Sequence, residues 1–139
     1  MTVVTGRADG QALGLAVNSF TSVSLRPALV AFCVSTRSST WPRLRSAGTF
    51  CVNMLAEDQE VLSRSFAAAI DRFDGVGWRP APSGAPILAG VLAWVDCTIE
   101  AEHEAGDHLI VVGRVGDLDL EHEGRPLVFY RGGYGRFEP

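Results

Sequence analysis

Positive charge and long apolar runs are both scarce in this sequence. The 139 residues carry 12 Lys and Arg against 16 Asp and Glu, a formal net charge of −4, and the basic residues do not cluster. Because a nucleic-acid-binding face needs clustered basic side chains to neutralise phosphates, we expect no nucleic-acid partner. No stretch approaches about 18 continuous apolar residues, and residues 1–6 do not resemble a signal peptide. We therefore expect a cytoplasmic protein with no membrane association.

Cysteine is also scarce, and its placement argues against a metal or disulfide framework. Cys33, Cys51 and Cys97 each lie inside an apolar, strand-like run, and no C-x-x-C occurs. Three scattered cysteines and three histidines lack the spacing of a zinc site. We expect buried, reduced thiols and no metal.

The common nucleotide and hydrolase signatures are absent as well. The sequence contains no G-x-G-x-x-G, no G-x-x-x-x-G-K-[ST] and no G-x-S-x-G. Any cofactor must therefore be bound without a Rossmann unit or a P-loop.

What the sequence does contain is a series of short apolar runs separated by turn residues. Its length suits one domain. Alternation or continuous apolar character predicts strands at 2–5, 12–18, 28–35, 49–55, about 91–103, 108–120 and 127–131, with a bulge near Asn18 and Ser19 where the alternation slips. Six or seven strands and two short helices indicate a mainly β protein, an antiparallel barrel that is closed or nearly closed.

Two helices are expected between these strands. Residues 40–45 have Thr40 as a candidate cap, Pro42 in the first turn and Gly48 just past the end. A second helix is expected at about 58–69, and the face predicted to be buried consists of Val61, Leu62, Ser65, Phe66 and Ala69. The Pro- and Gly-rich segment 71–86 is expected to be loop.

The most informative segment for function is residues 18–25, in which five of eight side chains are short and polar. An amide and four hydroxyls can satisfy phosphate oxygens and the polar edge of a heteroaromatic ring without adding charge. A solvent-facing strand edge explains the same composition. The slip in alternation favours a binding site, because bulges concentrate next to sites.

Three further features are candidates for ligand contacts. Residues 35–40 offer hydroxyls and Arg37 to a phosphate, although an ordinary capped loop would look the same. His108 follows Gly106 and Asp107 at a strand start and could contact a nicotinamide or protonate a reduced product, or simply lie on the surface. Tyr130 and Tyr134 flank a glycine pair that permits close approach of a planar ligand, or they are packing residues.

Taken in order, these segments resemble the short-chain flavin reductases, which have the FMN-binding split-barrel fold. The resemblance extends over nearly the whole chain and rests on residues 2–5, 18–25, 50–55, 71–73, 106–108 and 129–134. It implies a split barrel, a homodimer, and NAD(P)H-dependent reduction of FMN or FAD for a partner flavin-dependent monooxygenase. The family usually carries a helix before the position of Thr2, so we expect residues 1–139 to form a single domain that lacks this N-terminal helix.

The resemblance also implies roles for individual residues. His108 would be the residue at the nicotinamide. The flavin and its phosphate would be bound by Asn18, Ser19, Phe20, Thr21, Ser22, Ser24, Ser38, Ser39, Thr40, Asn53 and Arg72, with Tyr130 and Tyr134 where the nicotinamide stacks.

Hydride transfer between two stacked rings needs alignment more than a covalent catalyst, which fits a sequence without a catalytic triad. Two alternatives remain on the same fold: a flavin-binding protein without catalysis, and a flavoprotein that passes electrons to another acceptor such as ferric iron.

Overall fold

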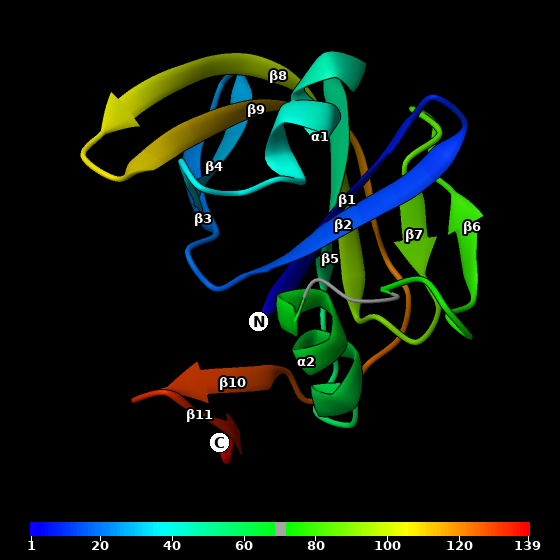
Figure 1. The fold of residues 1–139 in the computed structure, drawn as a ribbon. Helices are drawn as coiled ribbons and strands as arrows, with labels where there is room; N and C mark the ends of the chain where they lie inside the picture. The colour runs from blue at the N-terminus through cyan, green and yellow to red at the C-terminus, as the bar shows by residue number, and fades with distance from the viewer. Residues whose placement is uncertain (69–71) are drawn as a thin grey trace.

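The architecture is a curled seven-stranded antiparallel sheet, seen in a computed structural model that describes residues 1–68 and 72–139 (Figure 1). The strand order is β2-β1-β5-β8-β9-β4-β3. The strands span Thr2–Ala8 (β1), Gln11–Val17 (β2), Thr21–Leu25 (β3), Ala28–Ser35 (β4), Thr49–Met54 (β5), Ala93–Ala105 (β8) and His108–Leu120 (β9). This confirms the expected mainly β split barrel.

The sheet curls until β2 approaches β4, and the link between β2 and β3 closes that gap. Ser19 Oγ accepts a hydrogen bond from Cys33 N at 2.8 Å and donates one to Cys33 O at 3.2 Å. The Ser19 hydroxyl thus joins the link after β2 to β4. The predicted irregularity near Asn18 is this non-strand link, and a true register shift follows between Ser22 and Ser24.

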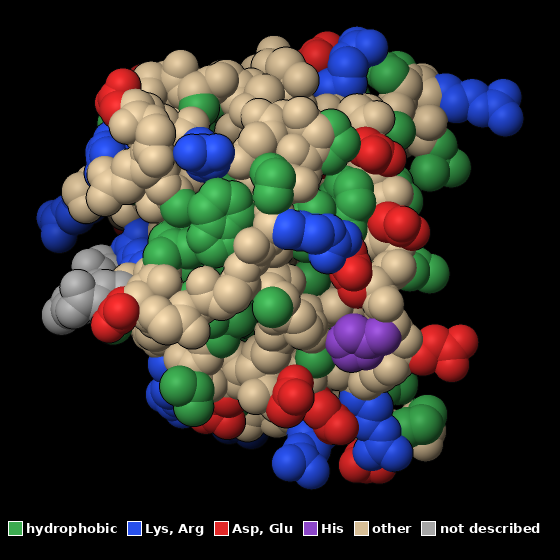
Figure 2. All heavy atoms as spheres, turned by 90° about the vertical axis from the view of Figure 1, so that its right-hand side faces the viewer, with side chains coloured by type: hydrophobic (Ala, Val, Ile, Leu, Met, Phe, Trp, Pro, Cys, Tyr) green, Lys and Arg blue, Asp and Glu red, His purple; other side chains and the backbone are tan. Residues whose placement is uncertain are grey.

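Two helices and two hairpins flank the seven-stranded sheet in the described part of the chain, and the C-terminal hairpin lies beside the second helix (Figure 1). They are α1 (Trp41–Ala47), α2 (Glu60–Ala68), the pair β6 (Trp78–Pro80) and β7 (Pro86–Leu88), and the pair β10 (Leu127–Tyr130) and β11 (Gly133–Arg136). On the face over β6 and β7, hydrophobic side chains are interspersed with charges of both signs (Figure 2). In the described part of the chain, no helix is long and apolar enough to cross a membrane.

Aromatic rings fill the barrel interior below α1. Phe32 packs edge-on against Trp41 and Phe50, with centroid distances of 5.5 and 5.2 Å. A Cβ on Gly113 would lie 2.5 Å from Phe50 Cζ, so glycine is required for this ring to lie against β9. All three rings are buried, and packing of this kind contributes about 0.5–1.5 kcal/mol per pair beyond area burial.

A second core lies outside the barrel, between β1, α2 and the β6–β7 hairpin. Phe66 of α2 is fully buried there and packs edge-on against Phe73 at 5.1 Å. A Cβ on Gly14 would lie 2.6 Å from Phe66 Cε1, so this glycine lets α2 approach β2. The close approach places α2 beside β2.

The first helix is confirmed, but its predicted cap is wrong. Gly48 has φ 74° just past the helix end, as expected. Thr40 has helical dihedral angles and makes no capping hydrogen bond; Ser38 Oγ instead accepts the hydrogen bond of Trp41 N at 3.1 Å. The Thr40 hydroxyl is therefore left to accept a hydrogen bond from elsewhere in the chain.

Two further expectations about the elements are wrong. Val61 is 81% exposed, while Ser63 is fully buried because its hydroxyl pairs with Tyr134 Oη at 2.8 Å; Ala69 lies outside the described residues. The segment 71–86 is not all loop, because residues 78–80 pair with 86–88.

The last part of β9 forms an open edge of the sheet. β4 pairs with β9 only as far as Arg114, so residues 116–120 pair with β8 alone. Asp117 Oδ1 accepts a hydrogen bond from Leu118 N at 2.9 Å, and Asp119 Oδ1 accepts one from Leu120 N at 2.8 Å. The outward N–H groups of this edge are thus satisfied by the side chains of their own strand.

Candidate functional site

Two cavities meet at the side chain of Arg72. The first, of about 360 Å³, is called the His108 cavity here and is lined by Asn18, Ser19, Cys33, Ser38, Phe66, Arg72 and His108, among others. The second, of about 510 Å³, is called the Asp74 cavity and is lined by Gln11, Ala12, Ser39, Thr40, Arg72, Phe73 and Asp74, among others. The structure therefore brings together seven of the predicted site residues: Asn18, Ser19, Ser38, Ser39, Thr40, Arg72 and His108.

Arg72 is held in place by one nitrogen and leaves another without a partner. Its Nη1 donates hydrogen bonds to Gly14 O and, at 2.7 Å, to Thr40 Oγ1. Its Nε is buried and finds neither a hydrogen-bond acceptor nor a carboxylate within ion-pair distance among the described residues. Burial lowers the pKa of this guanidinium, which nevertheless stays charged because an arginine pKa begins far above neutrality.

An orphaned charged donor between two cavities fits an anionic ligand. A buried donor without a partner costs about 1–3 kcal/mol, which an acceptor from a bound molecule would offset. Phosphate oxygens are strong acceptors for a guanidinium. The donor set therefore suits the phosphate of a nucleotide-like cofactor.

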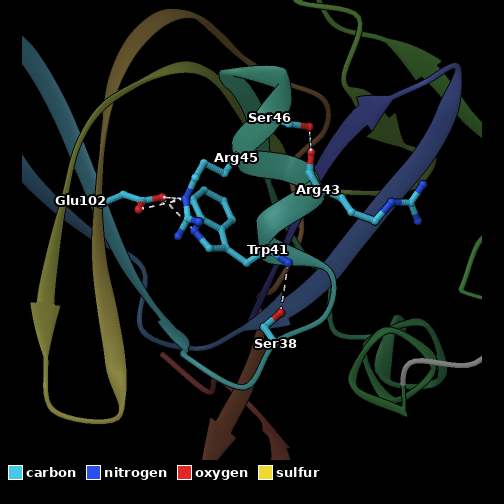
Figure 3. Close-up of polar contacts among 6 residues, drawn as sticks. All are labelled: Ser38, Trp41, Arg43, Arg45, Ser46 and Glu102. Atoms are coloured by element: carbon cyan, nitrogen blue, oxygen red, sulfur yellow. Dashed lines mark hydrogen bonds and ion pairs between the residues drawn. The ribbon is translucent and has the colours of Figure 1, made fainter.

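Helix α1 holds the serine-rich rim of the site through Glu102 (Figure 3). Trp41 Nε1 donates to Glu102 Oε1 at 2.9 Å, and Arg45 Nε donates to both oxygens of the same carboxylate at 2.8 and 3.0 Å. Trp41 is almost completely buried, and its backbone N–H is the one that Ser38 accepts. The position of Ser38 is thus fixed by a helix that is itself anchored to β8.

His108 lies at the mouth of its cavity, at the start of β9. It pairs in register with Ser35 of β4, which explains how a residue far along the chain reaches the serine-rich rim. Its Nδ1 lies 2.7 Å from Asp107 Oδ1, and the side chain is 47% exposed. The hydrogen bond with His108 lowers the pKa of Asp107, so the carboxylate is charged near neutrality and orients the imidazole. The other ring nitrogen makes no hydrogen bond to the described residues.

Asn53 lines neither cavity, so its predicted flavin contact stays a prediction. Its side chain is fully buried between β1, β5 and β7. Nδ2 donates to Val3 O and Thr5 Oγ1, both at 3.1 Å, and Oδ1 accepts from Leu88 N at 2.9 Å. These hydrogen bonds occupy the side-chain amide of Asn53 in joining β5 to β1 and β7.

Six other predicted residues lie outside the two cavities of this chain. Phe20 packs against the barrel core, and Thr21, Ser22 and Ser24 lie on the edge strand β3, which is largely exposed. Tyr130 is 72% exposed on β10, and Tyr134 packs against Phe129 while its hydroxyl pairs with Ser63. A seventh candidate, Arg37, also lies outside both cavities and is exposed.

Several lining residues were not predicted from the sequence. The continuous apolar run predicts a buried Cys33, yet this residue is only partly buried and lines the His108 cavity. Gln11 and Ala12 follow an ordinary hairpin turn and carry no distinctive signal. Asp74 and Phe73 were within reach, because they directly follow Arg72 in a segment already singled out; Asp71 lies outside the described residues.

Comparison with known proteins gives a consistent result. The sequence matches the family described as the flavin reductase like domain over residues 1–138. It is 49% identical over 130 residues to a flavin reductase of Pseudomonas putida, covering 93% of this chain and 76% of that protein. It is 44% identical over 140 residues to HsaB, the reductase subunit of a flavin-dependent monooxygenase from Rhodococcus jostii, covering 100% of this chain and 72% of that protein.

Solved structures agree with the sequence relatives. Nitrilotriacetate monooxygenase component B from Mycobacterium thermoresistibile matches with a TM-score of 0.95 and 42% identity, over 99% of this chain and 79% of that one. The NADH:FAD oxidoreductase SgcE6 of Streptomyces globisporus, in complex with NAD and FAD fragments, matches with a TM-score of 0.92 and 39% identity, over 99% and 84%.

Proposed function

This chain belongs to the flavin reductase-like family, and on that premise we propose how its site works. It is an NAD(P)H:flavin oxidoreductase that supplies reduced FMN or FAD to a monooxygenase. We place the flavin ring in the His108 cavity and the flavin phosphate against Arg72. The observation that carries this placement is the buried, unpartnered Nε of Arg72.

The residues of the His108 cavity align two rings and exclude water. When flavin and NADH are bound, they supply a hydride transfer that needs ring atoms about 3–3.5 Å apart and no covalent catalyst. Val17 and Phe66 give the cavity apolar walls, while Asn18 and Ser38 offer polar groups at its rim. Arg72 anchors the phosphate and so fixes the position of the ring along the cavity.

His108 is proposed to contact the nicotinamide. It lies at the mouth of the cavity, beyond the residues that would hold the flavin, and is accessible to a second substrate. Asp107 fixes the orientation of the ring, so that the free nitrogen is the one available to the ligand.

We further propose a homodimer in which the polar segment 20–24 and Tyr130 complete the site of the partner subunit. On β3, Val23 and Leu25 are 53% and 86% exposed, which is unusual for apolar residues on a strand. Sedimentation velocity at micromolar concentration tests this proposal. A monomer with full activity would contradict it.

The reaction is proposed to take place in the cytoplasm. Cys33, Cys51 and Cys97 are free thiols, which suits a reducing compartment. Reduced flavin would leave by the open cavity for the monooxygenase.

Arg72→Ala and Arg72→Lys test the function and the placement together. We expect Arg72→Ala to weaken FMN binding, measured by fluorescence titration, by about tenfold or more, since a charge-assisted hydrogen bond contributes about 1.5–3 kcal/mol. The Arg72→Lys variant should retain part of the affinity, because lysine keeps the charge but not the fork of donors. Arg114→Ala is the matched control, because Arg114 is exposed and pairs with Glu100.

Flavin absorbance in the same samples separates the alternatives. A reductase bleaches flavin when NADH is added under anaerobic conditions. A non-catalytic flavin-binding protein would bind flavin without bleaching it, and a ferric-iron reductase would oxidise NADH efficiently only with iron present. If Arg72→Ala binds flavin with unchanged affinity, the flavin phosphate does not lie at Arg72. That result would not bear on the proposed reductase activity.

A further inference from the structure

The two ends of the curled sheet meet beside the His108 cavity. β2 and β3 stand at opposite ends of the strand order, and residues 18–20 carry the chain from one to the other. The lining of the cavity takes residues 15–19 from the β2 side of this crossing and residues 33–35, at the end of β4, from the other side. The spacing between these two segments therefore sets the width of the cavity.

The side chain of Ser19 stands where the next backbone pair between β3 and β4 would be. Thr21 pairs with Ala31 in the antiparallel register. Two positions beyond this pair, the same register would oppose Ser19 to Cys33. The chain has left the strand there, and the Ser19 hydroxyl replaces the missing backbone partner, because it bonds to both N and O of Cys33. One side chain thus ends the ladder and lets the main chain of residues 18–20 diverge from β4.

These two hydrogen bonds leave the Ser19 hydroxyl little to offer a ligand. A hydroxyl has one hydrogen and two lone pairs. Its hydrogen is donated to Cys33 O, and one lone pair accepts from Cys33 N, so a single lone pair remains. Phe20, the next residue, packs against the barrel core and holds the crossing from its other side. The neighbouring Asn18, in contrast, is exposed at the cavity.

We propose that Ser19 is a positioning residue, which acts on the flavin through Cys33 by fixing the spacing between the end of β2 and the end of β4. Its hydroxyl holds the two walls of the His108 cavity together and does not itself bind the flavin. This inference rests on the proposed function, which places the flavin ring in that cavity. Because hydride transfer needs ring atoms about 3–3.5 Å apart, a change in wall spacing alters the rate of flavin reduction as well as flavin affinity.

Ser19→Ala removes both hydrogen bonds and tests the proposal, with Ser46→Ala as the matched control. Ser46 is exposed on α1, its Oγ donates to Arg43 O at 2.6 Å, and it lines neither cavity. Ser19→Cys is nearly isosteric and makes only weak hydrogen bonds, so it keeps the test available if Ser19→Ala does not fold. Fluorescence titration measures FMN affinity, anaerobic stopped flow measures flavin reduction at saturating FMN and NADH, and NMR measures hydrogen exchange of the Cys33 amide.

All three measurements should change together in Ser19→Ala. FMN should bind about tenfold or more weakly, because two hydrogen bonds that shape its cavity are lost. Reduction at saturating FMN should slow by about tenfold to a hundredfold, the effect expected when reacting atoms are misplaced by about 1 Å. The Cys33 amide should exchange about tenfold faster or more, because its acceptor is gone. Ser19→Cys should change all three in the same direction by less, and Ser46→Ala should match wild type.

Weaker FMN binding without faster exchange at Cys33 would make Ser19 a direct flavin contact and overturn the proposal. Weaker binding with a normal reduction rate at saturating FMN would overturn it too, since the alignment of the rings would then be intact. Faster exchange at Cys33 with unchanged affinity and rate would show that the flavin does not depend on this spacing. A wild-type protein that neither binds nor reduces flavin would instead refute the proposed function, while the exchange of the Cys33 amide would still report whether Ser19 joins the two strands.

Discussion

At the scale of single residues, Asn53 joins three strands through one amide. It bonds to β1 through Val3 and Thr5 and to β7 through Leu88. We expect Asn53→Ala to lower the free energy of unfolding by about 1–3 kcal/mol for each buried group left unpaired. Urea denaturation measures this loss, with the exposed Asn18→Ala as control. A variant with normal stability but weak flavin binding would contradict the structural role.

His108 should affect the second substrate alone. Because it lies at the mouth of its cavity and is proposed to touch the nicotinamide, we expect His108→Ala to raise KM for NADH or slow flavin reduction, while flavin affinity stays near the wild-type value. A positioning effect in the transition state lowers kcat and kcat/KM together, whereas lost binding raises KM only. Stopped-flow traces that match wild type at every NADH concentration would make His108 a surface histidine.

Residue types alone separate site residues from packing residues poorly. His108 could be singled out by its place after Gly106 and Asp107 at a strand start, whereas Arg72 was predicted only from the family resemblance. Asn53 carries the same polar group as a ligand contact, yet its partners Val3, Thr5 and Leu88 are far away in the sequence. Only the register of the strands shows where those hydrogen bonds go.

At the scale of secondary-structure elements, α1 is fastened to β8 by one carboxylate. Glu102→Ala leaves the buried indole N–H of Trp41 without an acceptor, so we expect the free energy of unfolding to fall by about 1–3 kcal/mol. Flavin affinity should fall as well, because α1 positions Ser38. Glu100→Ala is the matched control on the same strand, since Glu100 pairs with the exposed Arg114 and should change stability little. Equal denaturation curves for both variants would contradict the anchoring role.

A histidine links the turn before β8 to the segment before β10. His122 Nε2 lies 3.0 Å from Gly90 O and Nδ1 lies 3.0 Å from Glu123 O, so both nitrogens face acceptors. The hydrogen bond with Gly90 raises the pKa of His122 most, and the one with Glu123 raises it further. The nearby carboxylates of Asp58 and Glu121 add to the effect.

A raised folded-state pKa stabilises the protein below the unfolded pKa of about 6.5, and this stabilisation is lost as the pH rises through the folded value. We expect the melting temperature of wild type to exceed that of His122→Asn by more at pH 5.5 than at pH 8.5. Thermal scans across this range measure the difference. A gap that is constant with pH would rule out the linkage.

The long strands could be predicted from the sequence, whereas the shortest ones could not. Alternation and apolar runs identify β4 and β9 almost to the residue, because a strand with a buried face must repeat with period two. The three-residue strands β6 and β7 are too short for a period and contain proline, so their pairing depends on the core beneath them. The burial of Ser63 instead of Val61 depends on Tyr134, which lies 71 residues further along the chain.

At the scale of the whole molecule, the site exists only when the barrel is complete. The described lining of the two cavities comes from residues 11–19, 33–35, 38–40, 66–67, 72–74 and 108, segments that are separate in the unfolded chain. Flavin should therefore bind the folded state alone and stabilise it by about 2.7 kcal/mol at a concentration one hundred times Kd. Differential scanning calorimetry with increasing FMN should show a rising melting temperature. A melting temperature independent of FMN would contradict a site assembled by folding.

The open edge of β9 affects the tendency of the protein to aggregate at high concentration. An exposed strand with free N–H groups is a template on which strands of other chains add, and this addition is how cross-β fibrils grow. Along residues 116–120 the side chains of Asp117 and Asp119 already occupy the outward donors of Leu118 and Leu120, and they add charge beside two exposed leucines. An incoming strand would have to displace both aspartates before it formed its first hydrogen bond, so this edge resists fibril growth.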